Sequence, residues 1–262
     1  MRFSIATWNI NSVRIRMELI ARFLRSERPD ILCLQELKSP ADKIACSAFA
    51  EMGYDQSVLR GQKAYNGVAV FSRIPITDMG SKDMLGNGSA RHVAVQLDNG
   101  IIIENFYVPA GGYEPDPVTN PKFGEKLDYV RAMRDWSRQE QPTRKILVGD
   151  LNIAPQEDDV WSHRQLLNVV SHTPAEVDLL NSVIEGGNWT DIVRADIPHG
   201  KLYSWWSYRS PDWDAADKGR RLDHIWATPD LVRDHHCSRI LRSVRGWERP
   251  SDHVPVIAEF DL

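Results

Sequence analysis

Short apolar runs separated by polar turns dominate the chain, and they predict more strands than helices. Alternate positions from Val254 to Phe260 are apolar, which is typical of a strand with one buried face. Residues 91–109 hold two apolar runs around an Asp-Asn-Gly turn at 98–100, which predicts a β-hairpin. Further strands are expected at 3–10, 30–36, 66–73, 145–152, 202–208, 222–228 and 238–244.

Helical spacing of apolar residues is found in several longer segments. Ser12 is a suitable N-cap for a helix that ends before Pro29. The apolar face of this helix would comprise Ile15, Leu19, Ile20, Phe23 and Leu24. The other helices are expected at 39–53, 122–139 and 173–187.

The order of these elements predicts an α/β fold. Hairpins mixed with crossover helices favour mixed sheets over a purely parallel one. Two packed mixed β-sheets flanked by helices, a four-layered α/β sandwich, would accommodate so many strands. No linker-like segment interrupts the 262 residues, of which 42% are hydrophobic, so we expect a single domain over residues 1–262.

Composition narrows the possible partners. The chain has 32 basic and 36 acidic residues, a formal net charge of −4, which excludes a protein coated in positive charge. A local surplus of basic residues remains between Lys218 and Arg249, a segment with eight basic and four acidic residues. Such a run is either a solvated surface or a local site for a polyanion.

The three cysteines are widely spaced and contain no C-x-x-C motif, so no disulfide framework or cysteine zinc site is expected. The first ten residues alternate like a strand and lack the continuous apolar stretch of a signal peptide. No apolar run is long enough to cross a membrane. We therefore expect a cytoplasmic protein that has no membrane partner.

Polar residues recur where the predicted strands begin or end. Any one carboxylate at such a position is usually a turn cap, but a set at one edge of a sheet is typical of a binding site. The set comprises Asn9, Asn11, Glu36, Tyr107, Asp150, Asn152, Asp223, Asp252 and His253.

These residue types suit phosphate-ester hydrolysis with a hard metal ion. Carboxylate oxygens favour Mg²⁺, or Mn²⁺ in its place. The chain has few histidines and no cysteine cluster, so the ligands that would favour zinc are lacking. An imidazole can stabilise the transferring phosphoryl group when an aspartate fixes its tautomer. A second aspartate can orient or deprotonate the attacking water.

Six motifs, "WNIN", "LQE", "YVP", "GDLN", "RLDHIWAT" and "RPSDHVPV", follow one another along the chain. In this order they resemble the exonuclease III family of abasic-site endonucleases, within the endonuclease/exonuclease/phosphatase superfamily. "SWWSYRS" and "RPSDH" are similar to the bacterial branch. The resemblance implies Mg²⁺-dependent incision of duplex DNA 5′ to abasic sites. It also implies trimming of blocked 3′ ends as a 3′→5′ exonuclease and 3′-phosphatase or phosphodiesterase. A monomer associated with the nucleoid is expected.

The resemblance also implies roles for individual residues. Glu36 matches the principal metal ligand, and Asn11 and Asp252 match further groups around the metal. Some relatives carry aspartate where this chain has Asn11.

The catalytic roles follow in the same way. His253 matches the histidine that contacts the scissile phosphate, Asp223 matches its orienting partner, and Asp150 matches the residue that handles the nucleophilic water. Phosphate positioning and transition-state contacts are implied for Asn9, Asn152 and Tyr107.

Five residues are candidates for contact with DNA: Arg91, Trp205, Trp213, Arg220 and Arg221. The arginines would bind the backbone without reading sequence, Trp205 would line the pocket, and Trp213 would wedge into the base stack or pack within its own loop. Arg220 stands where animal relatives place an aromatic pocket wall.

Other conspicuous residues are expected to be structural. Trp206 is assigned to the core, and His224 to a structural position. His92, His235 and His236 lack carboxylates at informative spacing and are expected at the surface.

Two other functions would use a similar set of residues. One is a superfamily enzyme for a different phosphoester, such as an inositol-phosphate phosphatase, a sphingomyelinase or a nonspecific nuclease, and the C-terminal motif and the tryptophan pair disfavour it. The other is a catalytically silent DNA-binding or scaffold member, which the complete set of site residues disfavours.

Overall fold

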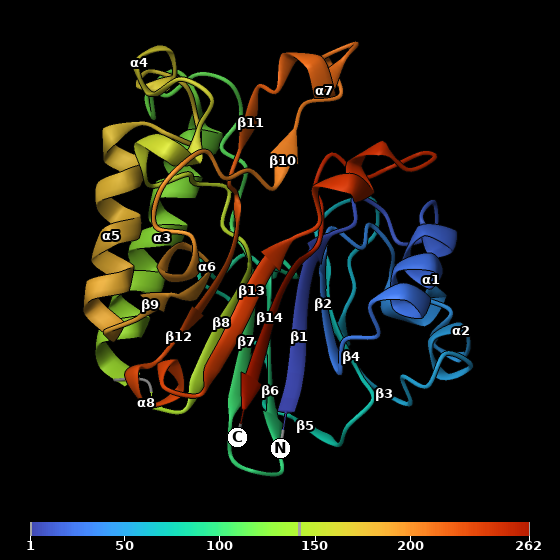
Figure 1. Cartoon of the computed structure of the whole chain (residues 1–262). Coiled ribbons are helices and arrows are strands. Elements are labelled where there is room, and N and C mark those ends of the chain that lie inside the picture. The colour runs from blue at the N-terminus through green and yellow to red at the C-terminus, as the bar shows by residue number, and fades with distance from the viewer. Residues whose placement is uncertain (1, 141–142, 262) are drawn as a thin grey trace.

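Two six-stranded sheets pack face to face at the centre of the molecule (Figure 1). The computed structural model describes residues 2–140 and 143–261. In spatial order the first sheet contains β13 (His235–Ile240), β14 (Val256–Asp261), β1 (Arg2–Asn9), β2 (Ile31–Gln35), β4 (Val68–Ser72) and β3 (Gln56–Arg60). The second contains β5 (Ile76–Asp78), β6 (His92–Leu97), β7 (Ile102–Tyr107), β8 (Lys145–Asp150), β12 (Asp223–Ala227) and β9 (Thr190–Asp191). A short ribbon, β10 (Trp205–Trp206) with β11 (Gly219–Arg220), stands beyond the sheets.

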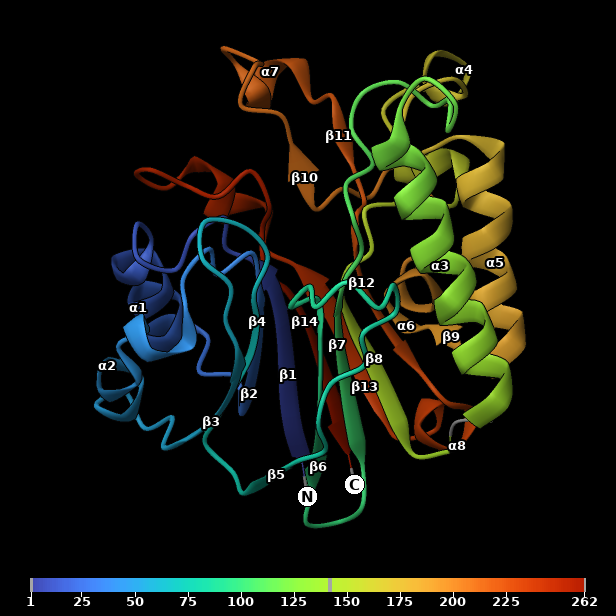
Figure 2. The same ribbon diagram turned by 180° about the vertical axis from the view of Figure 1, so that it is seen from behind.

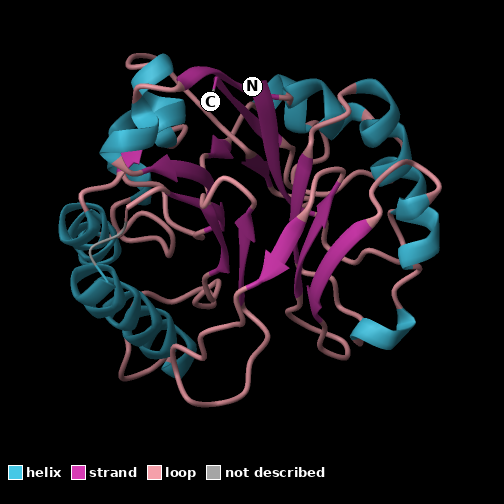
Figure 3. Cartoon of the chain, turned by 90° about the horizontal axis from the view of Figure 1, so that it is seen from below, coloured by secondary structure: helices cyan, strands magenta, loops and turns pink. Residues whose placement is uncertain are grey.

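Helices cover the outer face of each sheet (Figures 2 and 3). The described helices are α1 (Met17–Ser26), α2 (Cys46–Ala50), α3 (Pro121–Glu140), α4 (His163–Leu166), α5 (Pro174–Gly187), α6 (Ile192–Asp196), α7 (Trp213–Ala216) and α8 (Pro229–Val232). α1 and α2 lie on the first sheet, and α3 and α5 lie on the second. The expected architecture of two mixed sheets flanked by helices is thereby confirmed. Among the described helices, none has the length and apolar character needed to cross a bilayer.

The alternation along β1 shows why the layers form. Ile5 faces the second sheet and joins the core between the sheets, whereas Ala6 and Trp8 face the helices. The Trp8 ring packs edge-on against Phe23 of α1, with 5.5 Å between centroids. Successive side chains of a strand point to opposite faces, so one apolar strand contributes to two cores.

The helix expected after Ser12 begins later than predicted. α1 starts at Met17, and Ile15 is exposed instead of buried. The backbone N–H groups of Ser12 and Val13 donate to the carbonyls of Glu36 and Leu37. This pairing prolongs the contact of β1 with β2 beyond the strand, so the chain cannot turn into a helix at Ser12. The prediction of Ser12 as an N-cap was wrong.

Three other predicted elements differ in extent. The strand at 202–208 is reduced to the two residues of β10, and the strand at 238–244 lies at 235–240 and gives way to a 3₁₀ helix at Arg242–Gly246. The helix at 39–53 is split into a 3₁₀ turn at Ala41–Lys43 and the short α2. β3 was not anticipated, because it is an edge strand with only one buried residue and no run of apolar positions.

The sheet topology brings the strand ends of interest to one edge. β1 and β2 are parallel, and β14 runs antiparallel to β1, so the C-terminal ends of the first two lie beside the start of β14. β7, β8 and β12 repeat this arrangement in the second sheet. The polar residues at these six strand ends therefore converge at the edge that is uppermost in Figure 1.

Gly149 permits the close approach of β8 to β7 immediately before Asp150. Its φ is +141°, and an added Cβ would lie 1.9 Å from the carbonyl oxygen of Phe106. A side chain would have to push backbone against backbone at this point. Glycine is therefore required for Asp150 to take its position.

We expect Gly149→Ala to lower the free energy of unfolding by well over about 1 kcal/mol, because both the backbone conformation and the contact with β7 oppose a side chain. Chemical denaturation measures this change. Gly100→Ala is the matched control: Gly100 also has a positive φ, +85°, but an added Cβ would meet nothing within 4 Å. Equal losses in the two variants would show that the approach to Phe106 carries no cost.

Candidate active site

Three buried side chains from three strands meet at this edge. Asp150 ends β8, Asp223 begins β12 and His253 precedes β14, and one oxygen or nitrogen atom of each lies within 4.8 Å of the other two. His253 Nδ1 lies 2.8 Å from Asp223 Oδ2, and His253 Nε2 lies 3.7 Å from Asp150 Oδ2. The expected proximity of the three residues is thus observed.

Asp223 fixes the orientation of the imidazole. Its Oδ2 also accepts a hydrogen bond of 2.6 Å from Ser204 Oγ, whose own oxygen accepts from the Asp223 backbone N–H. With Nδ1 engaged by this carboxylate, only Nε2 of His253 is directed toward Asp150. The arrangement presents one N–H of the ring to the open side of the site.

Asn9 connects the carboxylates of the two sheets. Its Nδ2 donates to Glu36 Oε1 at 3.0 Å and to Asp150 Oδ2 at 2.8 Å. Tyr107 OH donates to the same Glu36 oxygen at 2.7 Å. A neutral amide and a phenol thereby hold two acidic groups close together without adding negative charge.

Asn152 secures the other side of Asp150. Its backbone N–H donates to Asp150 Oδ1 at 2.9 Å, and its side-chain amide donates to Asp150 Oδ2 at 3.1 Å. Asn152 adopts a φ of +53°, which turns the chain back toward the carboxylate. Asparagine tolerates this conformation better than most residues, so its presence at this turn has a local as well as a chemical reason.

Lys38 was not anticipated from the sequence, and it marks a cation position. Its Nζ lies 2.7 Å from Glu36 Oε2 and 2.6 Å from Asn11 Oδ1. Two of the three residues expected around a metal therefore already converge on one positive charge. The only signal in the sequence was a lysine two residues after Glu36, which an ordinary surface lysine would give equally well.

Asp252 lies on the far side of Asn11. Its Oδ1 accepts from Asn11 Nδ2 at 3.1 Å, and its Oδ2 accepts from the Trp205 indole N–H at 3.0 Å. Asn11 thus links Asp252 to Lys38 and, through it, to Glu36. Carboxylate and amide oxygens are the ligand type that hard divalent cations prefer. Among the described residues, the acidic cluster whose ligand atoms lie close enough together to hold a metal ion is Asp150, Asp223 and His253, and neither Glu36 nor Asp252 belongs to it.

The buried charges shift one another's protonation. Burial raises the pKa of Asp150 to about 7, although the charge of His253 opposes the shift. Burial would lower the pKa of His253, but the negative charges of Asp223 and Asp150 outweigh it and raise that pKa to about 10. Burial would raise the pKa of Glu36, but the Lys38 charge and the hydrogen bonds from Asn9 and Lys38 lower it overall. A positive imidazolium at neutral pH follows.

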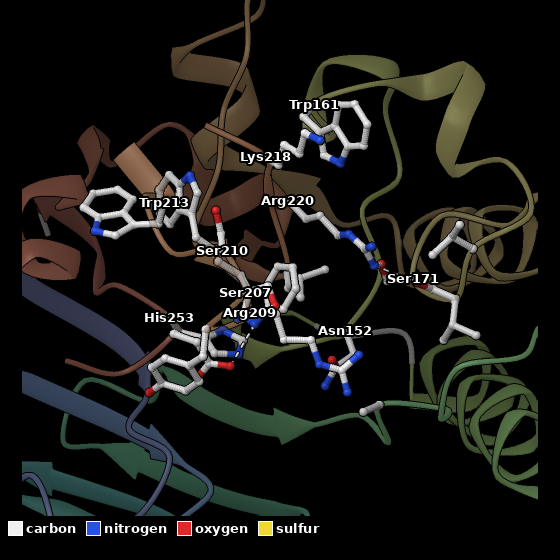
Figure 4. A pocket seen from close by; sticks show the side chains of 18 of the residues that line it. Asn152, Trp161, Ser171, Ser207, Arg209, Ser210, Trp213, Lys218, Arg220 and His253 are labelled. Carbon is white, nitrogen blue, oxygen red and sulfur yellow. Dashed lines mark hydrogen bonds between the residues drawn. The ribbon is translucent and has the colours of Figure 1, made fainter. Parts of the chain in front are cut away.

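A cavity of about 780 Å³ opens above these residues (Figure 4). Glu36, Asn152, Asp252 and His253 lie along it, and its walls include Trp161, Trp205, Trp206, Trp213, Lys218 and Arg220. Trp205 is half-buried and faces the cavity, while Trp206 is 1% exposed and belongs to the core. The Trp213 ring packs edge-on against that of Trp206, with 5.3 Å between centroids. Trp213 therefore packs on its neighbours as well as lining the cavity.

Several cations lie over aromatic rings, and three of them, Arg209, Lys218 and Arg220, line the cavity, whereas Arg91 is not among its lining residues. The guanidinium of Arg91 lies 4.7 Å from the Tyr107 ring, that of Arg209 5.1 Å from Tyr113, and that of Arg220 5.3 Å from Trp205. The Lys218 ammonium lies 4.7 Å from Trp161. Rings position these groups without neutralising them, so their charge stays available to an anionic ligand.

Arg221 does not join them, which corrects its expected role in DNA binding. Its side chain is completely buried, with Nε 2.7 Å from Asp159 Oδ1 and Nη1 2.6 Å from Asp191 Oδ2. A residue that is shielded from solvent and neutralised by two aspartates cannot reach a phosphate. Its function is to tie the segment after β11 to the loop at Asp159 and to β9.

Two of the predicted surface histidines are also placed differently. His92 is 1% exposed, and its Nε2 lies 2.8 Å from Glu104, which also pairs with Lys145. His235 pairs with Asp196 at 2.8 Å, and its side chain is 7% exposed. The partners lie 12 and 39 residues away, so local spacing could not reveal them.

Residues 6–253 match the model of the Endonuclease/Exonuclease/phosphatase family. The chain is 24% identical to exodeoxyribonuclease III of Haemophilus influenzae over 97% of this chain and 98% of that protein. It is 28% identical to an exodeoxyribonuclease of Bacillus subtilis over 96% of this chain and 97% of that protein.

Solved structures agree over the whole length. The 3′ phosphatase NExo from Neisseria, bound to product DNA hairpin, superposes with a TM-score of 0.90 at 32% identity, covering 99% of this chain and 100% of that chain. An AP endonuclease from Archaeoglobus fulgidus superposes with a TM-score of 0.91 at 30% identity, with the same coverage.

We expect Arg221→Gln to lower the free energy of unfolding by about 3–5 kcal/mol, because it breaks two buried ion pairs and leaves Asp191 without an arginine and Asp159 with Arg194 alone. Arg220→Gln is the matched control, since the neighbouring arginine forms no salt bridge among the described residues and should cost far less. Urea denaturation of both variants measures the difference. Similar losses would contradict the distinction between the two arginines.

We expect the stabilising charge on His253 to be lost as pH rises. Its pKa is about 10 in the folded chain and about 6.5 when unfolded, so its contribution is complete below pH 6.5 and disappears as pH passes 10. Between pH 7 and 10 in EDTA, the free energy of unfolding should fall more steeply than in His253→Gln, by up to about 1.4 kcal/mol per pH unit. Parallel pH profiles would mean that His253 is neutral in the folded protein.

Proposed function

This chain belongs to the endonuclease/exonuclease/phosphatase family, and from that membership and the site geometry we propose that it is a metal-dependent DNA repair nuclease of the exonuclease III type. It hydrolyses the phosphodiester 5′ to abasic sites in duplex DNA. It also trims 3′ ends as a 3′→5′ exonuclease and as a 3′-phosphatase or phosphodiesterase. The observation that carries the proposal is the buried Asp150–His253–Asp223 cluster at the floor of an open cavity.

Each residue of the site has a separate role in hydrolysis, which its position determines. Asp150 orients the attacking water and accepts its proton, a role that its pKa of about 7 suits. His253 directs its Nε2 proton toward a non-bridging phosphoryl oxygen, because Asp223 holds Nδ1. Positive charge aimed at the phosphoryl group stabilises the charge that develops in the transition state. Asn9, Asn152 and Tyr107 position the phosphate.

The metal is Mg²⁺, with Mn²⁺ able to replace it. Glu36, Asn11 and Asp252 would hold it, and the fit is supported by Lys38, whose ammonium is already coordinated by Glu36 and Asn11 oxygens. When bound, the ion supplies Lewis-acid stabilisation of the phosphate. Lys38 would have to release those oxygens to admit it, and Asp252 would then remain held by Trp205.

Duplex DNA lies across the cavity. Arg91 contacts its backbone, and Trp205 and Trp213 form the wall beside the lesion. Lys218 and Arg220, the basic residues of the cavity wall that pair with no carboxylate among the described residues, make binding sensitive to salt and insensitive to sequence. We further propose that residues 1–262 act as one domain and as a monomer, in the cytoplasm and near the nucleoid. The apolar core shared by both sheets supports the single domain.

A panel of substrates tests the function. Matched duplexes with an abasic site, a 3′-phosphate or no damage are incubated with Mg²⁺ or with EDTA and resolved on a gel, beside inositol phosphates and sphingomyelin. Cleavage of the damaged duplexes that EDTA abolishes supports the proposal. Glu36→Gln should need more Mg²⁺ for half-maximal rate. Turnover of the lipid or inositol substrates alone would identify a different phosphoesterase, and cleavage of nothing would indicate a silent member.

We expect His253→Ala to lower kcat and kcat/KM together, on the order of 100-fold or more, because it removes a transition-state contact. Asp223→Ala should cost less. The double variant should lose little beyond His253→Ala, since the aspartate acts through the imidazole. Steady-state kinetics on the abasic duplex measures the three. Losses that add would contradict the pairing.

A further inference from the structure

Arg220 is a cation in the wall of the cavity that no carboxylate neutralises. Its Nη1 donates to the backbone carbonyl of Val170 at 2.8 Å and to Ser171 Oγ at 2.6 Å. Its Nε is buried without a partner, and Nη2 makes no hydrogen bond within residues 2–140 and 143–261. Figure 4 shows the guanidinium beside Ser171. A charge removed from water without a counter-charge is costly, unless a ligand supplies one.

Burial lowers the pKa of Arg220 and the negative charge of Glu176 opposes that shift, but Glu176 is already engaged. Glu176 pairs with the buried Lys126, and its oxygens also accept from the N–H groups of Ser171 and Thr173. The adjacent Arg221 differs in its burial and in its partners, because its side chain is completely buried while that of Arg220 lines the cavity. Arg221 has two aspartates and Arg220 has none.

Strand register places Arg220 on the same side as the catalytic histidine. Trp205 pairs with Arg220 on one side and, through an isolated bridge, with His253 on the other. Side chains of directly opposed residues point to the same face of a sheet. Arg220, Trp205 and His253 therefore form a row, with strands about 4.8 Å apart, and all three line the cavity.

Trp205 also contacts Arg220 at one end of this row and Asp252, the residue before His253, at the other. Its indole N–H holds Asp252, and its ring face carries the Arg220 guanidinium. On the opposite side, Ser171 is connected to the segment after Asp150, because its carbonyl accepts from the Ala154 N–H. Arg220 is thus held from two directions, two strands along the row from His253, in the wall of the same cavity.

Two substrates of the proposed nuclease differ in the charge of the phosphate that is cleaved. In an abasic site, the phosphate oxygen that enters the cavity is esterified to a neutral deoxyribose. In a 3′-phosphate the same oxygen is free, and the monoester carries about −1.5 to −2 at neutral pH instead of −1. Hydrolysis of the monoester joins the oxygen of water to phosphorus and breaks the bond to the 3′ oxygen. The 3′ oxygen takes up a proton, so the products are a 3′-hydroxyl and inorganic phosphate.

We propose that Arg220 binds the additional anionic oxygen of a terminal 3′-phosphate and thereby biases this site toward 3′-phosphomonoester ends over internal abasic sites. This inference rests on the proposed function and names the residue that sets the balance between its activities. An arginine–phosphate contact is a charge-assisted hydrogen bond, among the stronger polar contacts in proteins.

The test compares Arg220→Gln, which keeps hydrogen-bonding capacity but loses the charge, with Arg220→Lys, which keeps the charge. The first readout is the ratio of kcat/KM for 3′-phosphate removal to kcat/KM for abasic-site incision. We expect Arg220→Gln to lower this ratio roughly 10-fold or more and Arg220→Lys to lower it less. Lys218→Gln is the matched control: it removes one charge from the same cavity and should affect both substrates alike.

The second readout does not require turnover. In EDTA, the wild-type chain should bind a 3′-phosphorylated duplex more tightly than the 3′-hydroxyl duplex, and Arg220→Gln should abolish the difference. An unchanged activity ratio, or an equal loss on both substrates, would overturn the assignment of Arg220. A wild-type chain that cleaves no DNA would instead overturn the proposed function, and the binding ratio would still decide whether Arg220 reads the terminal phosphate.

Discussion

The hydrogen bond between His253 and Asp223 is the contact on which the site depends, because it joins the two sheets. His253 precedes β14 of the first sheet and Asp223 begins β12 of the second. Asn9 makes a second link of this kind, from β1 to Asp150 at the end of β8. Neither sheet holds a complete site by itself. The apolar core between them therefore determines the catalytic geometry as well as the stability.

Charge balance explains how so many acidic groups can be buried together. Isolated, each ionised carboxylate would be expelled from the interior. Glu36 has Lys38, and Asp223 and Asp150 have the imidazolium of His253. The neutral donors Asn9 and Asn152 supply the remaining hydrogen bonds. With Asp252 included, four carboxylates at the floor share two cations, Lys38 and His253, so the floor keeps a net negative charge. Lys218 and Arg220 in the cavity wall pair with no carboxylate among the described residues, and they offer local positive charge to a polyanion although the chain carries −4 overall.

Much of the sheet core could be predicted, because buried strands and the hairpin turn have strong local signals. The pairing of His253 with Asp223 was also anticipated, but only through the resemblance of the motifs, since 30 residues separate the two and no periodicity connects them. Ser12 misled because its backbone pairs with Glu36, a long-range contact that overrides the local capping signal. His92 and Arg221 were misplaced for the same reason, since their partners lie 12 and 62 residues away and are brought to them by packing. Lys38 was missed because a lysine two residues after a glutamate is equally typical of an ordinary surface.

The two arginines at 220 and 221 show what information was missing. Neighbouring residues in an extended segment face opposite ways, so one of the pair had to point into the cavity and the other away from it. The same rule applied to Trp205 and Trp206, where the sequence correctly placed the second ring in the core. What the sequence does not contain is the pairing of Trp205 with Arg220, which puts these two on one face. Once that register is known, Arg221 must point away from the cavity and into the protein interior, where Asp159 and Asp191 neutralise it. Strand register therefore determines which arginine lines the cavity. A slip of one residue would turn Arg220 toward the interior and Arg221 toward the cavity.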